Sequence, residues 1–268
     1  MTESRFKALI WDYYKNAGRH GLPWRKTKDP YRILVSEVML QQTQVPRVLA
    51  KYPEFLSRFP TTRSLARAKV SEILKVWKGL GYNRRALALK RVSEIVSIEF
   101  KGRFPKEAHE LESLPGIGPS TRGAIMAFSF GLPTTYIETN IRAVFLHFFF
   151  KGKKGVDDKE ILPLVERTLD RERPRDWYYA LMDYGVYLKR TLPNPSRASK
   201  HHARQASFKG SNREVRSKIL SYVLEKPRTQ KEIERYIGKT PHDIDKNIRD
   251  LVKEGFLAKA GKTLSARS

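Results

Sequence analysis

Apolar residues recur at helical spacing through most of the first 190 residues, and Gly or Pro interrupts each run. Two clear examples are "PYRILVSEVMLQQ" (30–42) and "RRALALKRVSEIVSIEF" (84–100). Alternation of the strand type is nearly absent before residue 250. The breaks, among them "HGLPW", "GLGY" and "LPGIG", hold residues that end helices. The pattern therefore predicts a mainly α fold with an all-helical body.

The pattern changes twice after that body. Between residues 191 and 212, Pro, Ser, Lys, Arg and His replace the apolar periodicity, which is typical of a basic linker. Residues 213–268 then favour three short amphipathic helices followed by two strands around a Gly turn, the order of a winged-helix domain. We therefore expect three parts: a two-lobed helical domain over 1–190, the linker over 191–212, and an α+β domain over 213–268.

The third helix of that last domain carries Lys246 and Arg249, which are the candidates for a DNA contact. Winged-helix domains also serve as protein-contact modules, and the residues alone leave both interpretations open.

The charge of the chain indicates a polyanionic partner. Lys and Arg number 53 against 28 Asp and Glu, which gives a formal net charge of +25. Such a charge favours DNA or RNA, although a basic surface without a ligand is the alternative. No apolar run reaches the roughly 18 residues of a membrane span, and no leader is evident. We therefore expect no membrane partner and a cytoplasmic or nuclear location.

The stretch "LPGIGPST" (114–121) joins two segments of helical pattern. Two glycines one residue apart allow a tight turn and leave backbone N–H groups uncovered at the start of the second helix. Such donors suit a DNA phosphate. The residues predict a helix–hairpin–helix motif, with an ordinary corner between two helices as the alternative.

These stretches together carry a family resemblance. The segment "LPWRKTKDPYRILVSEVMLQQTQV" (22–45) is followed in order by "WKGLGYNRRALAL" (77–89), the hairpin at 114–121 and "YIETNIRAV" (136–144). In these motifs the chain resembles the helix–hairpin–helix DNA glycosylases of the endonuclease III superfamily, and among them the adenine-specific mismatch glycosylases. The resemblance covers roughly residues 5–195.

Two carboxylates are the expected catalytic groups. Glu37 lies in the apolar stretch "LVSEVML", where partial desolvation favours the neutral acid that can protonate a departing base. A surface glutamate on an amphipathic helix is the alternative from the residues alone. The resemblance implies that Glu37 is this acid. It also places Glu138 and Asn140 where the family has an aspartate and an asparagine. An ionised carboxylate there stabilises the positive charge that develops on the sugar.

Glu138 is the main departure from the family. One extra methylene shifts the carboxylate by roughly 1.5 Å, and misplacement of about 1 Å can cost around a hundredfold in rate. The sequence leaves three outcomes open: a site rebuilt around Glu138, a weakened or redirected activity, or an engineered change.

The resemblance also implies residues that contact DNA. A base must be flipped out of the duplex before its glycosidic bond can be reached, which requires a wedge and a pocket. Gln42 and Tyr82 take the wedge positions. The pocket positions are Trp24, Leu40, Ser120 and Tyr179. The phosphate-binding hairpin comprises Leu114, Gly116, Ile117, Gly118, Ser120 and Thr121.

Ser120 stands where the glycosylase-lyases of this superfamily carry a lysine. That lysine forms a Schiff base with the sugar, and a serine cannot do so. We therefore expect a monofunctional enzyme that uses water and leaves the strand intact. The tyrosines of "WYYALMDYG" also depart from the polar residues of many relatives.

Many relatives bind an iron–sulfur cluster through four cysteines, and this chain contains no cysteine. The matching positions fall on Lys189, Ser196, Ser199 and Gln205. We expect no cluster and no catalytic metal. The resemblance allows a structural monovalent cation at the hairpin carbonyls near Leu114 and Ile117.

The sequence therefore predicts a monomeric base excision repair enzyme that binds double-stranded DNA containing a mismatch or lesion. Its expected reaction is excision of adenine opposite guanine or 8-oxoguanine. Two alternatives remain: a thymine or uracil mismatch glycosylase on the same fold, and a lesion-binding protein without excision activity.

Overall fold

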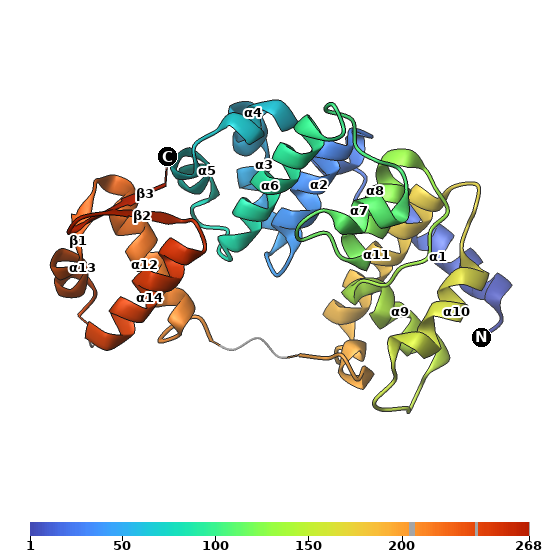
Figure 1. The fold of residues 1–268 in the computed structure, drawn as a ribbon. Helices are drawn as coiled ribbons and strands as arrows, with labels where there is room; N and C mark the ends of the chain where they lie inside the picture. Colours follow the sequence, from blue (N-terminus) through green and yellow to red (C-terminus); the bar gives the residue numbers. More distant parts are fainter. Residues whose placement is uncertain (204–206, 239–240, 268) are drawn as a thin grey trace. The chain divides into compact units, whose positions relative to one another are not determined.

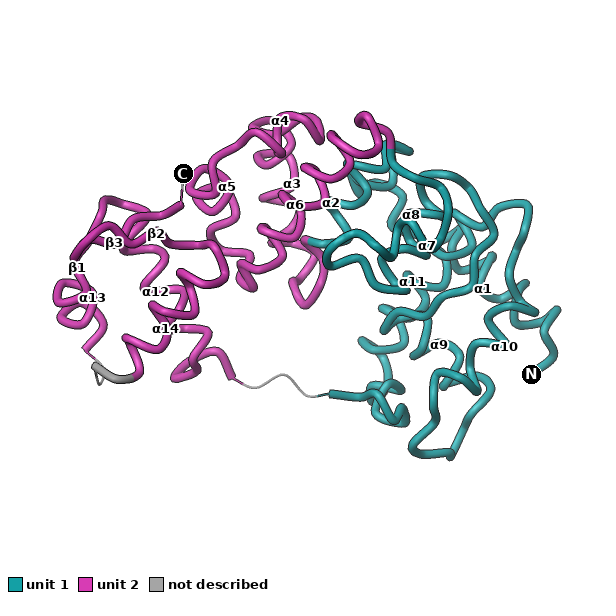
Figure 2. Tube along the Cα trace, viewed as in Figure 1, with its two compact units in different colours: residues 1–38, 104–204 teal, residues 39–103, 205–268 magenta. Residues whose placement is uncertain are grey.

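The computed structural model describes residues 1–203, 207–238 and 241–267, and most of that chain is helical (Figure 1). It divides into two compact units, each built from two separate stretches of sequence (Figure 2). Unit 1 comprises residues 1–38 and 104–204, and unit 2 comprises residues 39–103 and 205–268. The chain passes from the first unit to the second near the end of helix α2.

Unit 1 holds most of the long helices. Its elements are α1 (Glu3–Ala17), η1 (Pro23–Lys26), the larger part of α2 (Pro30–Leu40), α7 (Ala108–Ser113), α8 (Pro119–Phe130), α9 (Thr139–Phe149), α10 (Asp158–Thr168), α11 (Pro174–Thr191) and η2 (Pro195–Ala198). Helix α11 packs against α9, α1 and α8. Its Trp177 is fully buried and meets Phe6 edge-on, so an aromatic cluster centres this core.

Unit 2 combines a helical part with the C-terminal domain. The helical part contains α3 (Val45–Arg58), α4 (Thr62–Arg67), α5 (Val70–Trp77) and α6 (Arg84–Ile98). The C-terminal domain contains α12 (Asn212–Glu225), β1 (Arg228–Thr229), α13 (Gln230–Ile237), α14 (Pro241–Lys253), β2 (Leu257–Ala260) and β3 (Thr263–Ala266). Trp77 is fully buried at the end of α5 and packs against Phe55 of α3.

The three strands form one antiparallel sheet in the order β1-β3-β2. The two strands expected around a Gly turn are β2 and β3, with Leu257 opposite Ala266. The short strand β1 was not expected before residue 250. It pairs Arg228 with Leu264, and two residues are too few to show alternation in a sequence.

The mainly α fold with a small C-terminal α+β domain is confirmed. Three helices followed by a β-hairpin match the winged-helix order expected from residue 213. The three-part domain division stays a prediction. Among the described residues, none of the helices is long and apolar enough to cross a membrane.

Candidate active site

Glu37 lies on α2, in a helix whose neighbouring side chains are apolar and buried. The helix begins at Pro30, and the Asp29 carboxylate accepts a hydrogen bond from the Tyr31 amide at 2.9 Å, which caps the first turn. Val35 and Val38 beside Glu37 belong to the core. The Glu37 side chain is only partly accessible. Partial accessibility suits a group that must reach a substrate and yet avoid bulk water.

The surroundings of Glu37 favour its neutral form. Burial and, to a lesser extent, the charge of Glu138 raise the pKa of Glu37 to about 8, although the Arg25 guanidinium opposes the shift. At neutral pH the carboxyl group therefore carries a proton that it can donate. The acid role that the sequence predicted for this position stays a prediction.

Glu138 is the N-cap residue of α9. Its Oε1 accepts hydrogen bonds from the backbone N–H groups of Asn140 at 2.7 Å and Ile141 at 2.8 Å. Its Oε2 accepts a third from the Asn140 side-chain amide at 3.1 Å. The extra methylene relative to aspartate is thus absorbed by a carboxylate that folds back onto the start of its own helix. The helix dipole favours negative charge at that end.

Two opposing effects act on Glu138. Burial is the larger effect and raises its pKa above the ordinary value, while the amide hydrogen bonds from Ile141 and Asn140 and the charge of Lys189 act in the opposite direction. Two carboxyl groups in one buried site do not share the charge equally. The hydrogen-bonded Glu138 is the one placed to hold the negative charge, and Glu37 is the one placed to hold the proton.

Lys189 of α11 extends this arrangement, and the sequence did not single it out as a site residue. Its Nζ donates a hydrogen bond to Asn140 Oδ1 at 2.9 Å, which fixes the amide so that its NH₂ group faces Glu138. Burial lowers the pKa of Lys189, and the charge of Glu138 raises it. The only signal in the sequence was that a charged residue occupies the place of the family's first cysteine.

Helix α11 approaches Asn140 very closely at Gly185. A Cβ atom at Gly185 would lie 2.4 Å from the Asn140 carbonyl oxygen and 2.7 Å from its Cβ. Only glycine therefore allows α11 to bring Lys189 to the active site at this depth.

Tyr136 is a second buried group that the sequence missed. Burial raises its pKa well above the usual value, as do the charges of Tyr178, Glu37 and Glu138. Within the described part of the chain its hydroxyl group has no hydrogen-bond partner. A buried hydroxyl beside two carboxyl groups suits a hydrogen bond to substrate or water.

Of the four expected pocket residues, the structure buries Trp24 and Tyr179. The Tyr179 ring stacks on Phe128 with centroids 4.1 Å apart, and the Arg25 guanidinium lies 4.3 Å from the Tyr179 ring centre. Ser120 is partly accessible in unit 1, whereas Leu40 belongs to unit 2. Their role as a base pocket stays a prediction.

Arg25 is held by Asp183 of α11. Two hydrogen bonds of 2.7 Å join the guanidinium to the carboxylate, and Arg19 adds a third contact at 2.6 Å. Burial acts to raise the pKa of Asp183, but the hydrogen bonds and charges of Arg25 and Arg19 outweigh it and lower the pKa. This ion cluster fixes the guanidinium that faces both Tyr179 and Glu37.

The hairpin between α7 and α8 has the geometry of an anion site. Gly116 adopts φ 81°, which favours glycine, and the Ile117 N–H donates to the Leu114 carbonyl at 3.1 Å. Leu114 and Ile117 are buried and anchor the turn. Gly118 is the N-cap of α8, and no side chain caps this end. The backbone donors at the start of α8 therefore suit a phosphate.

The two expected wedge residues lie on turns of unit 2. Gln42 has φ 53° and Tyr82 has φ 47°, and these are two of only three non-glycine residues with positive φ in the described chain. Backbone strain of this kind clusters at functional sites.

Arg85 ties both turns together. Its guanidinium donates to the carbonyl oxygens of Met39 and Gln41 on one side and to those of Leu80 and Gly81 on the other. Burial lowers the pKa of Arg85 to about 10, so it stays charged. The structure therefore brings the two wedge turns to one arginine, although sequence reasoning did not select it.

The pair expected on the winged helix lies on α14. Lys246 and Arg249 are both exposed, and Arg249 forms an ion pair with Asp245 one turn away. Their DNA contact stays a prediction.

The positions that correspond to the family's cysteines serve other purposes here. Lys189 contacts Asn140, the Ser196 hydroxyl donates to the Thr139 carbonyl at 3.4 Å, and Ser199 pairs with Val156 in a short β-bridge. Gln205 lies outside the described residues. Among described residues no group of three or more His, Cys, Asp or Glu could hold a metal. With no cysteine in the chain, these positions do not fit a cysteine-held cluster.

Comparison with known proteins gives the family. Residues 35–177 match the HhH-GPD superfamily of base excision DNA repair proteins. The chain is 36% identical over 192 residues to an adenine DNA glycosylase of Buchnera aphidicola subsp. Baizongia pistaciae (strain Bp), a match that covers 70% of this chain and 54% of the relative. The chain therefore spans about half the length of such curated relatives.

Two further matches, one in sequence and one in structure, are to proteins named as thymine or thymine/uracil glycosylases. The chain is 32% identical to a thymine/uracil-DNA glycosylase of Pyrobaculum aerophilum, with 68% of this chain and 81% of that protein covered. A solved structure described as that of a thermostable thymine-DNA glycosylase superposes with a TM-score of 0.64 at 26% identity, over 72% of this chain and 90% of the other. The chain belongs to the HhH-GPD superfamily of base excision DNA repair proteins.

Proposed function

We propose that this chain is a monofunctional DNA glycosylase that excises adenine opposite guanine or 8-oxoguanine. The observation that carries the proposal is the pair of half-buried carboxyl groups with different environments. Glu37 sits in an apolar helix with its pKa raised to about 8, and Glu138 sits on three hydrogen-bond donors at the start of α9. Such a pair separates a proton donor from a charge stabiliser.

The reaction follows from those two roles. Glu37 donates its proton to a ring nitrogen of the flipped purine, which makes the base a better leaving group. As the glycosidic bond breaks, positive charge develops on the sugar, and the Glu138 carboxylate stabilises it. A water molecule then attacks the anomeric carbon and loses a proton. The products are a free base and an abasic strand.

No lysine serves as the strand-cleaving nucleophile in this proposal. Ser120, on the first turn of α8, takes the place of the family's Schiff-base lysine. Lys189 is the lysine that contacts the site, and its Nζ is engaged by Asn140 Oδ1. Strand breakage after excision therefore requires alkali.

The substrate is double-stranded DNA with a mismatch or lesion, bound at the hairpin before α8 and at the wedge turns of unit 2. The net charge of +25 supports this assignment. We place the enzyme, as a monomer, in the cytoplasm or the nucleus, where DNA is found.

A thymine or uracil glycosylase is the second candidate, because one specific observation favours it. The chain is similar to a thymine/uracil-DNA glycosylase in sequence and to a thymine-DNA glycosylase in structure.

Single-turnover excision on a duplex panel tests the proposal. The panel presents A opposite G, A opposite 8-oxoguanine, T opposite G and U opposite G, with matched duplexes as controls. Each reaction is read with and without alkali, for the native protein and for Glu138→Asp. We expect alkali-dependent cleavage at A.

Cleavage confined to T or U would replace adenine by the second candidate. Strand cleavage without alkali would contradict the monofunctional mechanism. Binding without excision by either protein would leave a lesion-binding protein. A Glu138→Asp variant faster than the native protein would show that the longer side chain weakens the site.

A further inference from the structure

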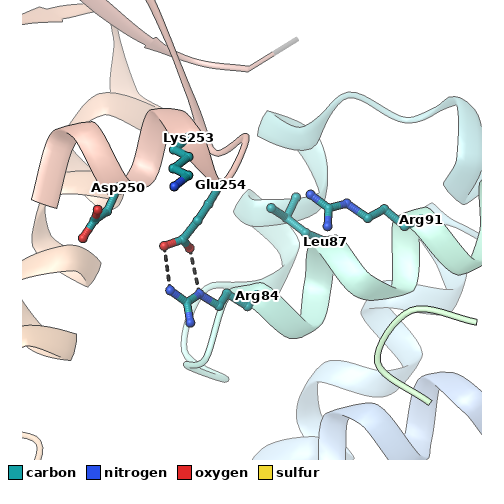
Figure 3. A pocket seen from close by; sticks show the side chains of 6 residues that line it. All are labelled: Arg84, Leu87, Arg91, Asp250, Lys253 and Glu254. Atoms are coloured by element: carbon teal, nitrogen blue, oxygen red, sulfur yellow. Dashed lines mark hydrogen bonds and ion pairs between the residues drawn. The ribbon is translucent and has the colours of Figure 1, made fainter. Parts of the chain in front are cut away.

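The C-terminal domain is fastened to the helical part of unit 2 at defined points. Glu254, which follows α14, accepts two hydrogen bonds from Arg84 of α6, at 2.7 and 2.8 Å (Figure 3). It accepts a third from Arg216 of α12 at 2.7 Å. The Ser71 N–H of α5 donates to the Arg267 carbonyl at 3.1 Å. The domain therefore has a fixed position on α5 and α6.

Figure 3 shows the surface that this contact creates. Arg84, Leu87 and Arg91 of α6 face Asp250 and Lys253 of α14 and the adjoining Glu254 across a shallow pocket. Glu254 is matched across this surface by Arg84 of the other helix. Charge complementarity of this kind holds the domain in one orientation, and α12 is held with it.

That orientation brings Arg213, near the start of α12, onto the expected wedge residue. Arg213 donates a hydrogen bond to the Tyr82 hydroxyl at 2.5 Å, and its guanidinium lies 5.3 Å from the centre of the Tyr82 ring. The Arg85 guanidinium lies 5.6 Å from the same ring centre. Two arginines from different parts of unit 2 therefore hold one tyrosine.

We propose that Arg213 is a positioning residue for Tyr82, so that the C-terminal domain pre-organises the DNA wedge of this enzyme. The inference rests on the proposed function, since it takes Tyr82 as the side chain that enters the duplex. This role for the C-terminal domain is independent of any DNA contact by Lys246 and Arg249 on α14.

The physical reason is conformational entropy. A tyrosine has two rotatable side-chain bonds, and a free ring must be ordered at the moment that it enters the base stack. Arg213 orders the ring beforehand, and a charged donor to a hydroxyl is stronger than a neutral one. Loss of Arg213 should therefore slow base extrusion by about fivefold, which is the scale of ordering one side chain.

The test compares Arg213→Ala with Lys218→Ala. Lys218 lies on the same helix, is exposed and forms an ion pair with Glu214, so its loss removes the same charge without touching Tyr82. We expect Arg213→Ala to slow single-turnover excision from a mismatched duplex about fivefold, and Lys218→Ala to leave it unchanged. A target base in a single-nucleotide bulge has no pairing partner to lose and is cheaper to extrude, so both variants should excise it at the native rate.

A double-mutant cycle with Tyr82→Phe isolates the contact. The Phe variant keeps the ring and loses only the hydroxyl acceptor, so it tests the idea without disturbing the fold. Arg213→Ala should then add little to Tyr82→Phe. Fully additive effects, an equal defect on the bulged substrate, or excision as fast as that of the native protein would each overturn the proposal.

Insertion can also be followed without catalysis. A duplex with a tetrahydrofuran abasic analogue beside 2-aminopurine brightens when the wedge enters the stack. If the native protein brightens this probe yet excises no base, the proposed function is refuted. The role of Arg213 in wedge insertion can still be tested by the fluorescence rise. We expect Arg213→Ala to slow the rise in fluorescence about fivefold, and an unchanged rise would refute the role of Arg213 alone.

Discussion

The candidate active site of unit 1 and the proposed wedge turns of unit 2 are built in opposite ways. In unit 1, Glu37 and Glu138 are half-buried, and their protonation is set by desolvation and hydrogen bonds. In unit 2, Gln42 and Tyr82 lie on strained turns, held from outside by Arg85 and Arg213. The comparison teaches that unit 1 depends on shifted carboxyl pKa values and unit 2 on strained backbone at two turns. Both features lower the stability of the folded protein.

The largest effect should follow from Glu37→Gln. The amide keeps the shape of the side chain but cannot donate an acidic proton, so excision should fall by about 10²- to 10⁴-fold. DNA affinity should not change, because no phosphate contact is lost. Single-turnover excision and a binding titration on the same duplex measure both quantities. Equal losses of affinity and of rate would argue against an acid role.

The same variant should be more stable than the native protein. The folded-state pKa of Glu37 is raised, so the folded protein is most stable below the unfolded-state pKa of about 4.5, where the group is protonated in both states. The free energy of unfolding then falls as pH rises toward about 8. Glu37→Gln removes this cost, so its free energy of unfolding at pH 8 should exceed the native value by roughly 1–3 kcal/mol. Denaturant unfolding at pH 5 and pH 8 checks the sign, because the gain should be small at pH 5.

A smaller effect is expected from Lys189→Met. The variant removes the ammonium group from Asn140 and a positive charge from the surroundings of Glu138, so the pKa of Glu138 should rise. Because Glu138 acts when ionised, excision should fall by about tenfold and its loss at low pH should begin at a higher pH. Lys189→Arg, which keeps the charge, is the matched control and should recover part of the rate. An unshifted pH profile would reduce Lys189 to a packing residue.

The smallest effect concerns strain in unit 2. Gln42→Gly relieves a positive φ at an exposed position, and it should raise the free energy of unfolding by about 0.5–1 kcal/mol. Gln44, two residues on, has φ −69°, so Gln44→Gly should destabilise instead. Thermal unfolding of the two variants gives the comparison. If both glycines destabilise equally, the turn at Gln42 stores no strain.

Much of unit 1 could be predicted from the sequence, because helical periodicity, Gly and Pro breaks and the hairpin motif are local signals. Glu37 was identified because an acid in an apolar stretch is unusual and because the motif order matched a family. Lys189 was missed because its contact with Asn140 joins positions 49 residues apart in sequence. Periodicity carries no information about such pairs.

Unit 2 was less predictable. The sequence selected Lys246 and Arg249 by analogy with other winged helices, whereas the contact that the structure reveals is from Arg213 to Tyr82 across 131 residues. Likewise, the sequence shows Arg85 only as one of several basic residues on a helix. Its contacts with the turns at Gln42 and Tyr82 are visible only in the folded structure. Charge clusters and strain at Gln42 and Tyr82 arise only from tertiary packing.

The pH dependence of single-turnover adenine excision between pH 6 and pH 10 tests the role of Glu37 most directly. In the proposed mechanism the acid form of Glu37 donates the proton, and its pKa is raised to about 8, so the rate should be level below that pH and fall about tenfold per unit above it. Glu37→Gln should show no such limb in its residual rate. A native rate that stays constant to pH 10 would contradict the assignment of Glu37 as the proton donor.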